Sequence, residues 1–192
     1  GDGTKSPYEL NINYFDALSH PNDPKRTKVD RFIAAHSILL SMAGVPGIYI
    51  HSLLGSQNYL QGVRETGIYR TINREKLNRN EVEEQLEDRD SIRYHVFNKL
   101  SELIKIRIQE ASFHPNASQK VLFLDERTFS LQRISNNESE MIISLTNVSK
   151  DKVSLTLDCH QLGISEEKVV DLVTDETLKA GENKINIELK PY

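Results

Sequence analysis

Residues 31–74 read RFIAAHSILLSMAGVPGIYIHSLLGSQNYLQGVRETGIYRTINR, and the fold of the chain is decided in this stretch. Apolar residues recur at helical spacing over 29–43, and Gly44 and Pro46 then end the pattern. Four largely apolar residues, 47–50, come next and a long polar segment follows them. This order predicts a helix that leads into a short buried strand, which is the α-to-β half of a parallel α/β unit. In such units the functional side chains lie on the loop after the strand.

Candidate binding residues lie directly after this predicted strand. His51 comes first, although a structural role, bonding a neighbouring loop carbonyl, is an equally good interpretation of it. The polar loop over residues 53–79 also carries Arg64, Arg70, Asn73 and Arg74. The planar donor fork of arginine suits paired hydroxyls, carboxylates or phosphates. Loop arginines are usually only solvated, so composition does not select one of the three.

The residues on either side of the loop are interpreted more simply. Residues 1–28 have the proline and Asn-Asp turns of a loop, with aromatic and amide side chains gathered over 8–15. A surface loop pinned by its aromatic residues is the default interpretation of that segment. His36 falls on the apolar face of the helix predicted over 29–43, which favours a packed core histidine.

Helical spacing continues as far as residue 111 and then gives way to strand spacing. Asn80 is placed to cap a short acidic helix over 80–88, and a longer helix is predicted over 91–111. The apolar stripe of that longer helix consists of Ile92, Val96, Leu100, Leu103, Ile104 and Ile108. Period-two runs then predict six strands, over 121–124, 129–134, 141–146, 153–157, 169–172 and 185–189. Together these strands predict a small antiparallel β-sandwich with a structural role.

Composition excludes several classes of function. The chain has 24 Lys and Arg against 28 Asp and Glu, and its net charge of −4 gives no electrostatic basis for binding nucleic acid. No uninterrupted apolar run approaches the length of a membrane span. A single cysteine, Cys159, fits a reducing, cytoplasmic compartment. No spacing typical of metal ligands is present, and no cofactor is expected.

One predicted parallel strand cannot form a sheet by itself, because its backbone groups need neighbouring strands. The chain also begins Gly-Asp-Gly-Thr, without an initiating Met. We therefore expect it to be the C-terminal piece of a longer enzyme, with the partner strands upstream.

The wording of two stretches adds a resemblance to this expectation. Residues 8–18 read YELNINYFDAL, and residues 44–50 read GVPGIYI and lead to an Ile-Asn-Arg word at 72–74. With a helix and a β-rich region after them, they resemble the C-terminal part of sucrose phosphorylase-like enzymes of glycoside hydrolase family 13, in the α-amylase superfamily. The resemblance implies an α/β plus all-β fold. Residues 1–115 would be the end of a (β/α)8 barrel and residues 116–192 a C-terminal β-sandwich domain.

The same resemblance implies a reaction and its partners. Enzymes of this family transfer a glucosyl group from a small α-glucoside to inorganic phosphate with retention, giving α-glucose 1-phosphate. Their catalytic carboxylates lie on earlier barrel strands, so no catalytic residue is expected here and the isolated piece should be inactive. The expected partners are the glucoside, phosphate and the remainder of the barrel, and a homodimer is compatible with the sequence.

The roles of individual binding residues can be transferred from the family only where its sequence motifs match this chain. Arg74 corresponds to the arginine that holds the glucosyl hydroxyls, and Tyr8 to the aromatic residue of the acceptor loop. Asn73 and His51 complete the expected substrate-binding set. Glu9 replaces a Gln typical of sucrose phosphorylases and is included as an acceptor-side residue.

Some alternatives remain open at this point. Ser6-Pro7 stands where sucrose phosphorylases place an aspartate for fructose. The wording around Glu9 looks more like that of glucosylglycerate and glucosylglycerol phosphorylases. A hydrolase of the same fold, an α-glucosidase or amylase, is a second interpretation. A non-catalytic carbohydrate-binding or interaction module is a third, although the chain has no Trp to form a sugar-stacking surface.

Overall fold

The computed structural model describes Gly3 and residues 10–192 of the 192-residue chain. The chain forms two compact units. The first contains the described residues up to Phe32 together with residues 48–97, and the second contains residues 33–47 and 98–192. Each unit is therefore assembled from two separate stretches of sequence.

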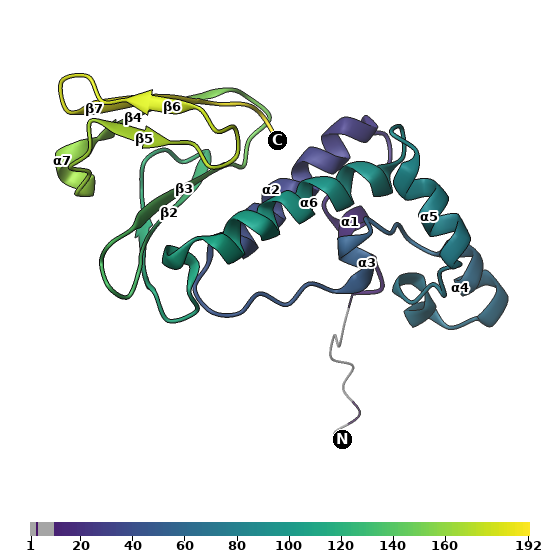
Figure 1. The fold of residues 1–192 in the computed structure, drawn as a ribbon. Coiled ribbons are helices and arrows are strands. Elements are labelled where there is room, and N and C mark those ends of the chain that lie inside the picture. The colour runs from purple at the N-terminus through teal and green to yellow at the C-terminus, as the bar shows by residue number, and fades with distance from the viewer. Residues whose placement is uncertain (1–2, 4–9) are drawn as a thin grey trace. The chain divides into compact units, whose positions relative to one another are not determined.

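Helices and polar turns make up the first unit (Figure 1). Its short elements are α1 (Tyr14–Ala17), α3 (Ile50–Leu53), α4 (Leu60–Thr66), the 3-10 helix η1 (Tyr69–Asn73) and α5 (Arg79–Glu87). Two long helices, α2 (Lys25–Ser41) and α6 (Ile92–Gln109), contribute their N-terminal parts to this unit and their C-terminal parts to the other.

The aromatic core of the first unit depends on how α1 begins. The side chain of Asn13 accepts a hydrogen bond from the backbone N–H of Phe15 at 3.3 Å and caps α1. Phe15 is fully buried, and its ring lies 5.1 Å from that of Phe32 on α2, tilted by 53°. Tilted aromatic pairs at this separation are favourable beyond the area that they bury. The cap and the ring contact together fix the chain around α1 against α2.

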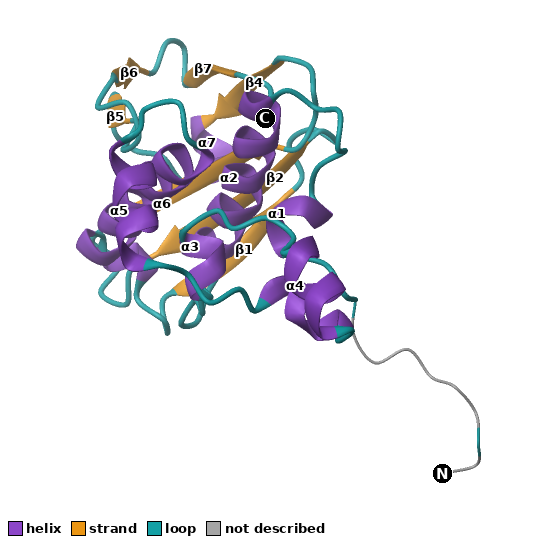
Figure 2. Ribbon diagram, turned by 90° about the vertical axis from the view of Figure 1, so that its right-hand side faces the viewer, coloured by secondary structure: helices purple, strands orange, loops and turns teal. Residues whose placement is uncertain are grey.

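The second unit is mainly antiparallel β-structure, drawn in orange in Figure 2. Its strands are β1 (Ser118–Leu122), β2 (Thr128–Ile134), β3 (Met141–Asn147), β4 (Val153–Asp158), β5 (Lys168–Val170), β6 (Thr177–Lys179) and β7 (Lys184–Leu189). They form a three-stranded sheet in the order β1-β2-β3 and two pairs, β4-β7 and β5-β6, all antiparallel. The 3-10 helix η2 (Ala111–Phe113) precedes β1, and the single turn α7 (Cys159–Leu162) follows β4.

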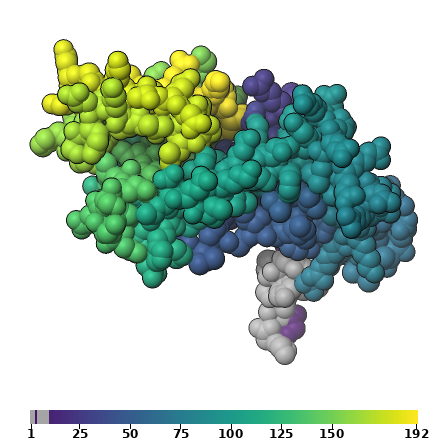
Figure 3. All heavy atoms as spheres, viewed as in Figure 1, coloured from purple at the N-terminus to yellow at the C-terminus, as the bar shows by residue number. Residues whose placement is uncertain are grey.

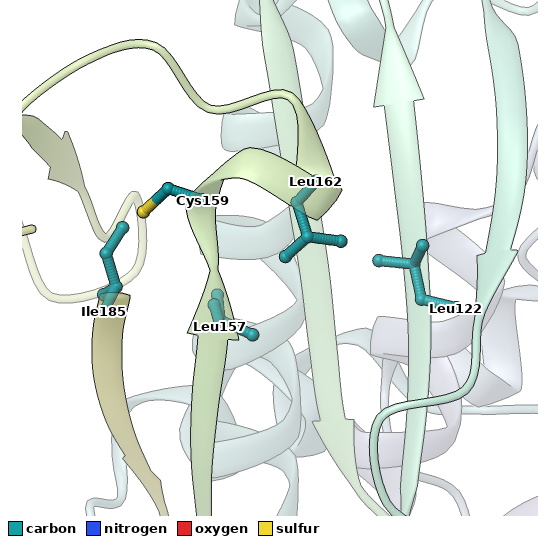
Figure 4. Packing of buried hydrophobic residues seen from close by; sticks show 5 residues of the cluster. All are labelled: Leu122, Leu157, Cys159, Leu162 and Ile185. Carbon is teal, nitrogen blue, oxygen red and sulfur yellow. The ribbon is translucent and has the colours of Figure 1, made fainter. Parts of the chain in front are cut away.

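An apolar cluster packs the three-stranded sheet against the β4-β7 pair. Leu122 of β1 and Leu162 of α7 point toward each other, with Leu157 of β4 close by, as Figure 4 shows. Cys159 lies next to Ile185 of β7, and both are almost completely buried. Two sheets joined by interdigitating side chains have the arrangement of a small sandwich. Figure 3 shows residues 118–192, coloured green to yellow, as one continuous body.

Two buried arginines tie the helical part of the second unit to its strands. Arg107 on α6 is 8% exposed and donates hydrogen bonds to the carbonyls of Leu40, Met42 and Gly44, the last two at 3.2 and 2.7 Å. These carbonyls lie at and just beyond the C-terminus of α2, where a helix leaves its last carbonyls unpaired. Gly44 has a φ of +94°, which confirms the left-handed residue predicted after the helix.

Arg133 on β2 completes this arrangement from the sheet. It is fully buried and donates to the carbonyls of Ser41 at 2.9 Å, His114 at 3.0 Å and Ser118 at 3.1 Å. One side chain therefore joins the end of α2, the turn after η2 and the start of β1.

The ring of Phe113 lies beneath both guanidinium groups. Their central carbons are 5.5 Å (Arg107) and 5.9 Å (Arg133) from the ring centroid, within the range of a cation–π interaction. Burial lowers the pKa of both arginines, and the charge of Arg107 lowers the pKa of Arg133 further. Within residues 10–192 neither group forms an ion pair, so backbone carbonyls and one aromatic face solvate two buried charges.

Most of the helices and strands predicted from the sequence are confirmed. The helices predicted over 29–43, 80–88 and 91–111 correspond to α2, α5 and α6, and His36 is buried at 2% exposure. The six predicted strands correspond to β1, β2, β3, β4, β5 and β7, with β1 beginning three residues earlier than expected. Among the described residues no helix combines the length and apolar character needed to cross a bilayer.

The strand predicted over 47–50 is wrong. Residues 45–49 have no assigned secondary structure, and α3 begins at Ile50. The backbone is extended at Tyr49, with φ −70° and ψ 142°, but no described strand pairs with it. A strand is defined by its ladder partners, so an extended apolar segment without them is not one.

Four smaller predictions also need correction. The loops expected over 1–28 and 53–79 contain α1, the first turn of α2, α4 and η1. Asn78, rather than Asn80, caps α5, because its side-chain oxygen accepts hydrogen bonds from the backbone N–H groups of Asn80 and Glu81. Ile108 is 75% exposed, since the last turn of α6 directs Arg107 inward instead. The short elements β6 and α7 were not predicted at all.

Arg133→Lys should destabilise the protein by about 3 kcal/mol, because one ammonium cannot reach the three carbonyls that the guanidinium spans. Urea unfolding measures this change. Arg127→Lys is the matched control, since Arg127 is partly exposed and pairs with Asp125 at 2.7 Å. It should change stability by less than about 1 kcal/mol. Equal effects at the two positions would contradict the structural role given to Arg133.

Glu110→Gln should stabilise the protein increasingly as the pH rises above the ordinary pKa of a glutamate. Burial, and then the charge of Glu140, raise the pKa of Glu110, which hydrogen-bonds to Glu140. The protonated form therefore stabilises the fold at low pH, and that stability is lost as the pH rises through the raised pKa. An amide stays neutral and can still donate.

Chemical unfolding of the wild type and Glu110→Gln from pH 4 to pH 8 tests this expectation. The two stability curves should converge at the acid end and separate toward neutral pH. Glu102→Gln removes the same charge at an exposed position of α6 and should give a curve parallel to the wild type. A constant offset for Glu110→Gln would show that its pKa is not raised.

Candidate functional site

The candidate site is built on residues 48–75, called here the site segment, which lies wholly in the first unit. Its first turn depends on Gly55, which follows α3 with a φ of +58°. A Cβ atom on Gly55 would lie 2.9 Å from Cγ2 of Val96 on α6, so both the backbone and the close approach require glycine. This turn brings the N–H of Ser56 to the carbonyl of His51 at 2.8 Å.

A buried polar cluster forms where this turn meets α6. His51 and Ser56 are 6% and 1% exposed, and Nδ1 of His51 lies 3.0 Å from Oγ of Ser56. Nη1 of Arg93 donates to the same Oγ at 3.0 Å. Because a guanidinium can only donate, we assign the hydroxyl proton of Ser56 to the bond with His51. His51, Ser56 and Arg93 are called the His51 cluster below.

Burial in this cluster favours a neutral histidine. It lowers the pKa of His51, the charge of Glu75 opposes this effect, and the charge of Arg93 adds a smaller lowering. Burial also lowers the pKa of Arg93, again against the effect of Glu75. An imidazole with a lowered pKa is uncharged near neutral pH and can accept a hydrogen bond at Nδ1.

Tyr49 connects the cluster to the end of η1. Its ring centroid lies 5.1 Å from that of His51, and its hydroxyl donates to the carbonyl of Asn73 at 3.4 Å. The opposite side of η1 is tied by the N–H of Tyr59, which donates to the carbonyl of Ile72 at 2.9 Å. The segment between α4 and residue 75 is therefore held at its last two η1 residues.

A second set of hydrogen bonds joins the site segment to the residues around α1. The side-chain oxygen of Asn58 accepts from the N–H of Asn13 at 2.6 Å, and the N–H of Asn58 donates to the carboxylate of Asp16 at 2.7 Å. Asn13 is 4% exposed, so this connection is buried. It orders the loop immediately before α4.

The structure brings some of the predicted binding residues together. Asn73 and Arg74 end η1, and His51 reaches them through Tyr49. The backbone N–H of Arg74 donates to Thr71 at 3.0 Å, while its guanidinium is exposed and forms no hydrogen bond or ion pair with any described residue.

The other predicted residues are less closely associated. Arg64 is exposed in the last turn of α4, and Arg70 is exposed on η1. Tyr8 and Glu9 lie outside the described residues.

Polar side chains also surround a hollow of about 320 Å³ next to the site segment. Its lining includes Glu75, Lys76, Gln85 and Arg93. Arg93 is held there by its Nε, which donates to Gln85 at 2.6 Å, and by Nη1, which donates to the carbonyl of Leu54 at 3.1 Å. Across the described part of the chain, no group of His, Cys, Asp and Glu side chains could hold a metal ion.

Sequence reasoning did not find Tyr49, Ser56, Glu75 or Arg93. Tyr49 had been counted as one apolar residue of a strand, and Arg93 falls off the apolar stripe of α6. A usable signal was nevertheless present, because Gly55 follows a short apolar segment and a buried turn of this kind needs polar groups to satisfy its backbone.

The fold is shared with parts of α-amylase-type structures. AmyP, solved with maltotriose, matches 93% of this chain and 36% of its own with a TM-score of 0.70 at 15% identity. An α-amylase from H. orenii matches 85% of this chain and 34% of its own, with a TM-score of 0.60 at 16% identity. At such identities only the fold follows. The chain is a mixed helix and antiparallel-sheet segment that matches part of these α-amylase structures.

Sequence relatives narrow the relationship. A glucosylglycerate phosphorylase from Spirochaeta thermophila is 43% identical over 74% of this chain and 24% of its own length. One from Escherichia coli is 41% identical over 78% of this chain and 27% of its own. A sucrose phosphorylase from Agrobacterium vitis is 29% identical over 82% of this chain and 29% of its own.

The identities with these relatives show to which proteins the chain is related. The chain is homologous to the glucosylglycerate phosphorylases and, at lower identity, to a sucrose phosphorylase. It spans about a quarter of the length of the curated relatives it matches. The sucrose 6F-phosphate phosphorylase from Thermoanaerobacter thermosaccharolyticum also matches in structure, over 99% of this chain and 32% of its own, with a TM-score of 0.57 at 22% identity. No protein-family model matches the chain.

Gly62→Ala should disturb the site segment although alanine is the better helix former. A Cβ atom at this position of α4 would lie 2.1 Å from the ring of Tyr59 and 2.9 Å from Thr71. The forced shift should destabilise the protein by about 1–3 kcal/mol, more than the gain of about 1 kcal/mol in helix propensity. Urea unfolding measures the balance.

Gly47→Ala is the control for the Gly62 substitution, because a Cβ atom there meets nothing within 4 Å. It should change stability by less than about 0.5 kcal/mol. A stabilising effect of Gly62→Ala would mean that Tyr59 yields freely and does not fix α4 against η1.

Proposed function

We propose that the chain is part of a retaining glycoside phosphorylase that transfers a glucosyl group from a small α-glucoside to inorganic phosphate, giving α-glucose 1-phosphate. Glucosylglycerate is the glucoside that we favour. The observation that carries this proposal is the identity of 41–43% with two glucosylglycerate phosphorylases over about three quarters of the chain. The identity with a sucrose phosphorylase is 29%.

We also propose that residues 1–115 contribute the last part of a (β/α)8 barrel and residues 116–192 a C-terminal β domain. Residues 45–49 support the barrel assignment, because no described strand pairs with them and the backbone at Tyr49 is extended. Val45 and Tyr49 are 82% and 53% exposed, as expected of side chains that further barrel elements would cover. The remainder of the barrel would then supply the catalytic carboxylates.

Within this proposal Arg74 holds the hydroxyls of the transferred glucosyl group. No residue within 10–192 bonds its guanidinium, and it stands at the end of η1 after Asn73, which would contact the same sugar. Tyr8 and Glu9 would contact phosphate or the leaving group. For His51, buried at 6% exposure, an indirect role fits better than direct contact and is developed below.

Hydrolysis is the second candidate, because the fold is shared with α-amylases. The TM-scores with AmyP and the H. orenii α-amylase, 0.70 and 0.60, exceed the 0.57 found with a phosphorylase. Fold likeness does not distinguish water from phosphate as the acceptor, since one fold hosts several chemistries. Sequence identity, which favours the phosphorylases, is the better guide to the site.

The deciding experiment uses the full-length protein that contains this chain, with glucosylglycerate, glucosylglycerol and sucrose as substrates. Glucose 1-phosphate should form from glucosylglycerate only when phosphate is present, and more slowly from the other two. Release of free glucose without phosphate would replace the proposal with the hydrolase. Faster turnover of sucrose would keep the phosphorylase and change its substrate.

Arg74→Ala should lower kcat/KM for the preferred glucoside by about 100-fold, because the charge-assisted hydrogen bonds to sugar hydroxyls are lost. Arg64→Ala is the matched control on the same segment and should stay within about twofold of the wild type, since Arg64 is exposed on α4. Equal losses at the two positions would remove Arg74 from the binding site.

A further inference from the structure

We infer that Tyr49 and Glu75 are positioning residues for Arg74, and that the His51 cluster anchors both of them. This inference rests on the sugar-binding role proposed for Arg74. Neither Tyr49 nor Glu75 needs to touch the substrate. Each instead fixes the backbone or the surroundings of a residue next to Arg74 in the chain.

Arg74 needs such support because its own contacts are few. Its backbone N–H donates to Thr71 at 3.0 Å, and no described residue holds its guanidinium. A long side chain on an exposed chain segment loses much conformational freedom when it binds a ligand. Fixing the backbone on either side of it reduces this loss and directs the guanidinium before the substrate arrives.

Support on the N-terminal side comes from Tyr49. Its hydroxyl donates to the carbonyl of Asn73, the residue directly before Arg74, at 3.4 Å. The ring of Tyr49 cannot swing away freely, because it packs on His51 with 5.1 Å between centroids. Since His51 is almost fully buried, it offers a fixed surface against which the Tyr49 ring packs.

Support on the C-terminal side comes from Glu75, which directly follows Arg74. Glu75 lines the same hollow as Arg93, and it is only partly exposed. Its carboxylate lies close enough to raise the pKa of both His51 and Arg93 against the effect of burial. Because Glu75 and Arg93 carry opposite charges and line one hollow, their attraction favours a position of residue 75 close to α6.

The anchor itself is rigid. Ser56 is 1% exposed and bonds His51 and Arg93 at 3.0 Å each. Arg93 also donates to Leu54 and Gln85, so three of its hydrogen bonds fix the guanidinium on α6. A buried polar network with its members satisfied in this way defines one geometry. The interactions of Tyr49 with Asn73 and of Glu75 with Arg93 both depend on this cluster.

The test is a double-mutant cycle in the full-length protein, with glucosylglycerate and phosphate as substrates. Tyr49→Phe removes only the hydroxyl and should lower kcat/KM by about twofold to tenfold. In an Arg74→Ala background the same substitution should have no further effect, because a positioning residue acts only through the residue that it positions. Tyr69→Phe is the control: Tyr69 is 72% exposed on η1 and should leave kcat/KM unchanged.

Amide hydrogen exchange gives a second readout that does not depend on activity. The Arg74 N–H should exchange about twofold to tenfold faster in Tyr49→Phe and in Glu75→Gln, and at the wild-type rate in Tyr69→Phe. Unchanged exchange in both variants would overturn the inference even if the enzyme is a phosphorylase. An equal loss of kcat/KM with and without Arg74 would also overturn it.

These outcomes are separable from failure of the proposed function. A wild-type protein that produces no glucose 1-phosphate would refute the phosphorylase, while faster exchange at Arg74 in the two variants would still support the positioning contacts. A phosphorylase whose Arg74→Ala variant keeps its full kcat/KM would refute the role of Arg74 and the positioning inference with it.

Discussion

The second unit depends on two guanidinium groups that are buried without a carboxylate. Arg107 and Arg133 are solvated by main-chain carbonyls from the end of α2, the turn after η2 and the start of β1, with one phenylalanine face beneath them. A charge so placed cannot move without leaving its carbonyls unpaired. Arg133 therefore fixes the start of β1 relative to the end of α2.

In the first unit, buried polar groups are satisfied by hydrogen bonds among both neutral and charged side chains. The His51 cluster satisfies a tight turn, and burial lowers the pKa of its histidine in spite of the opposing charge of Glu75. Two of its members, His51 and Ser56, lie in the sequence between the apolar segment at residues 45–49 and the exposed Arg74. Rigid polar support beneath a flexible ligand-binding side chain is a common arrangement at binding sites.

Periodicity alone located the long helices and nearly all strands, because α2, α6 and the β-rich region bury continuous apolar faces. It failed where tertiary partners decide the outcome. Residues 47–50 read as a strand, yet a strand exists only with a partner. Arg107 falls outside the apolar stripe predicted for residues 91–111, yet it is buried because it bonds the carbonyls at the end of α2. The candidate site followed the same rule: the Ile-Asn-Arg motif predicts a binding role for Arg74, whereas Ser56 and Arg93 become neighbours only after folding.

The extended segment at residues 45–49 has a consequence for how this chain behaves in solution. Its main-chain groups are paired by no described strand, and some of its apolar side chains are exposed. A strand of another chain can hydrogen-bond to such unpaired groups. Pro46 withholds one donor but leaves the rest of the edge open. The chain produced by itself should therefore associate with other copies in a concentration-dependent way. Folding to a monomer would require that this edge be covered during synthesis.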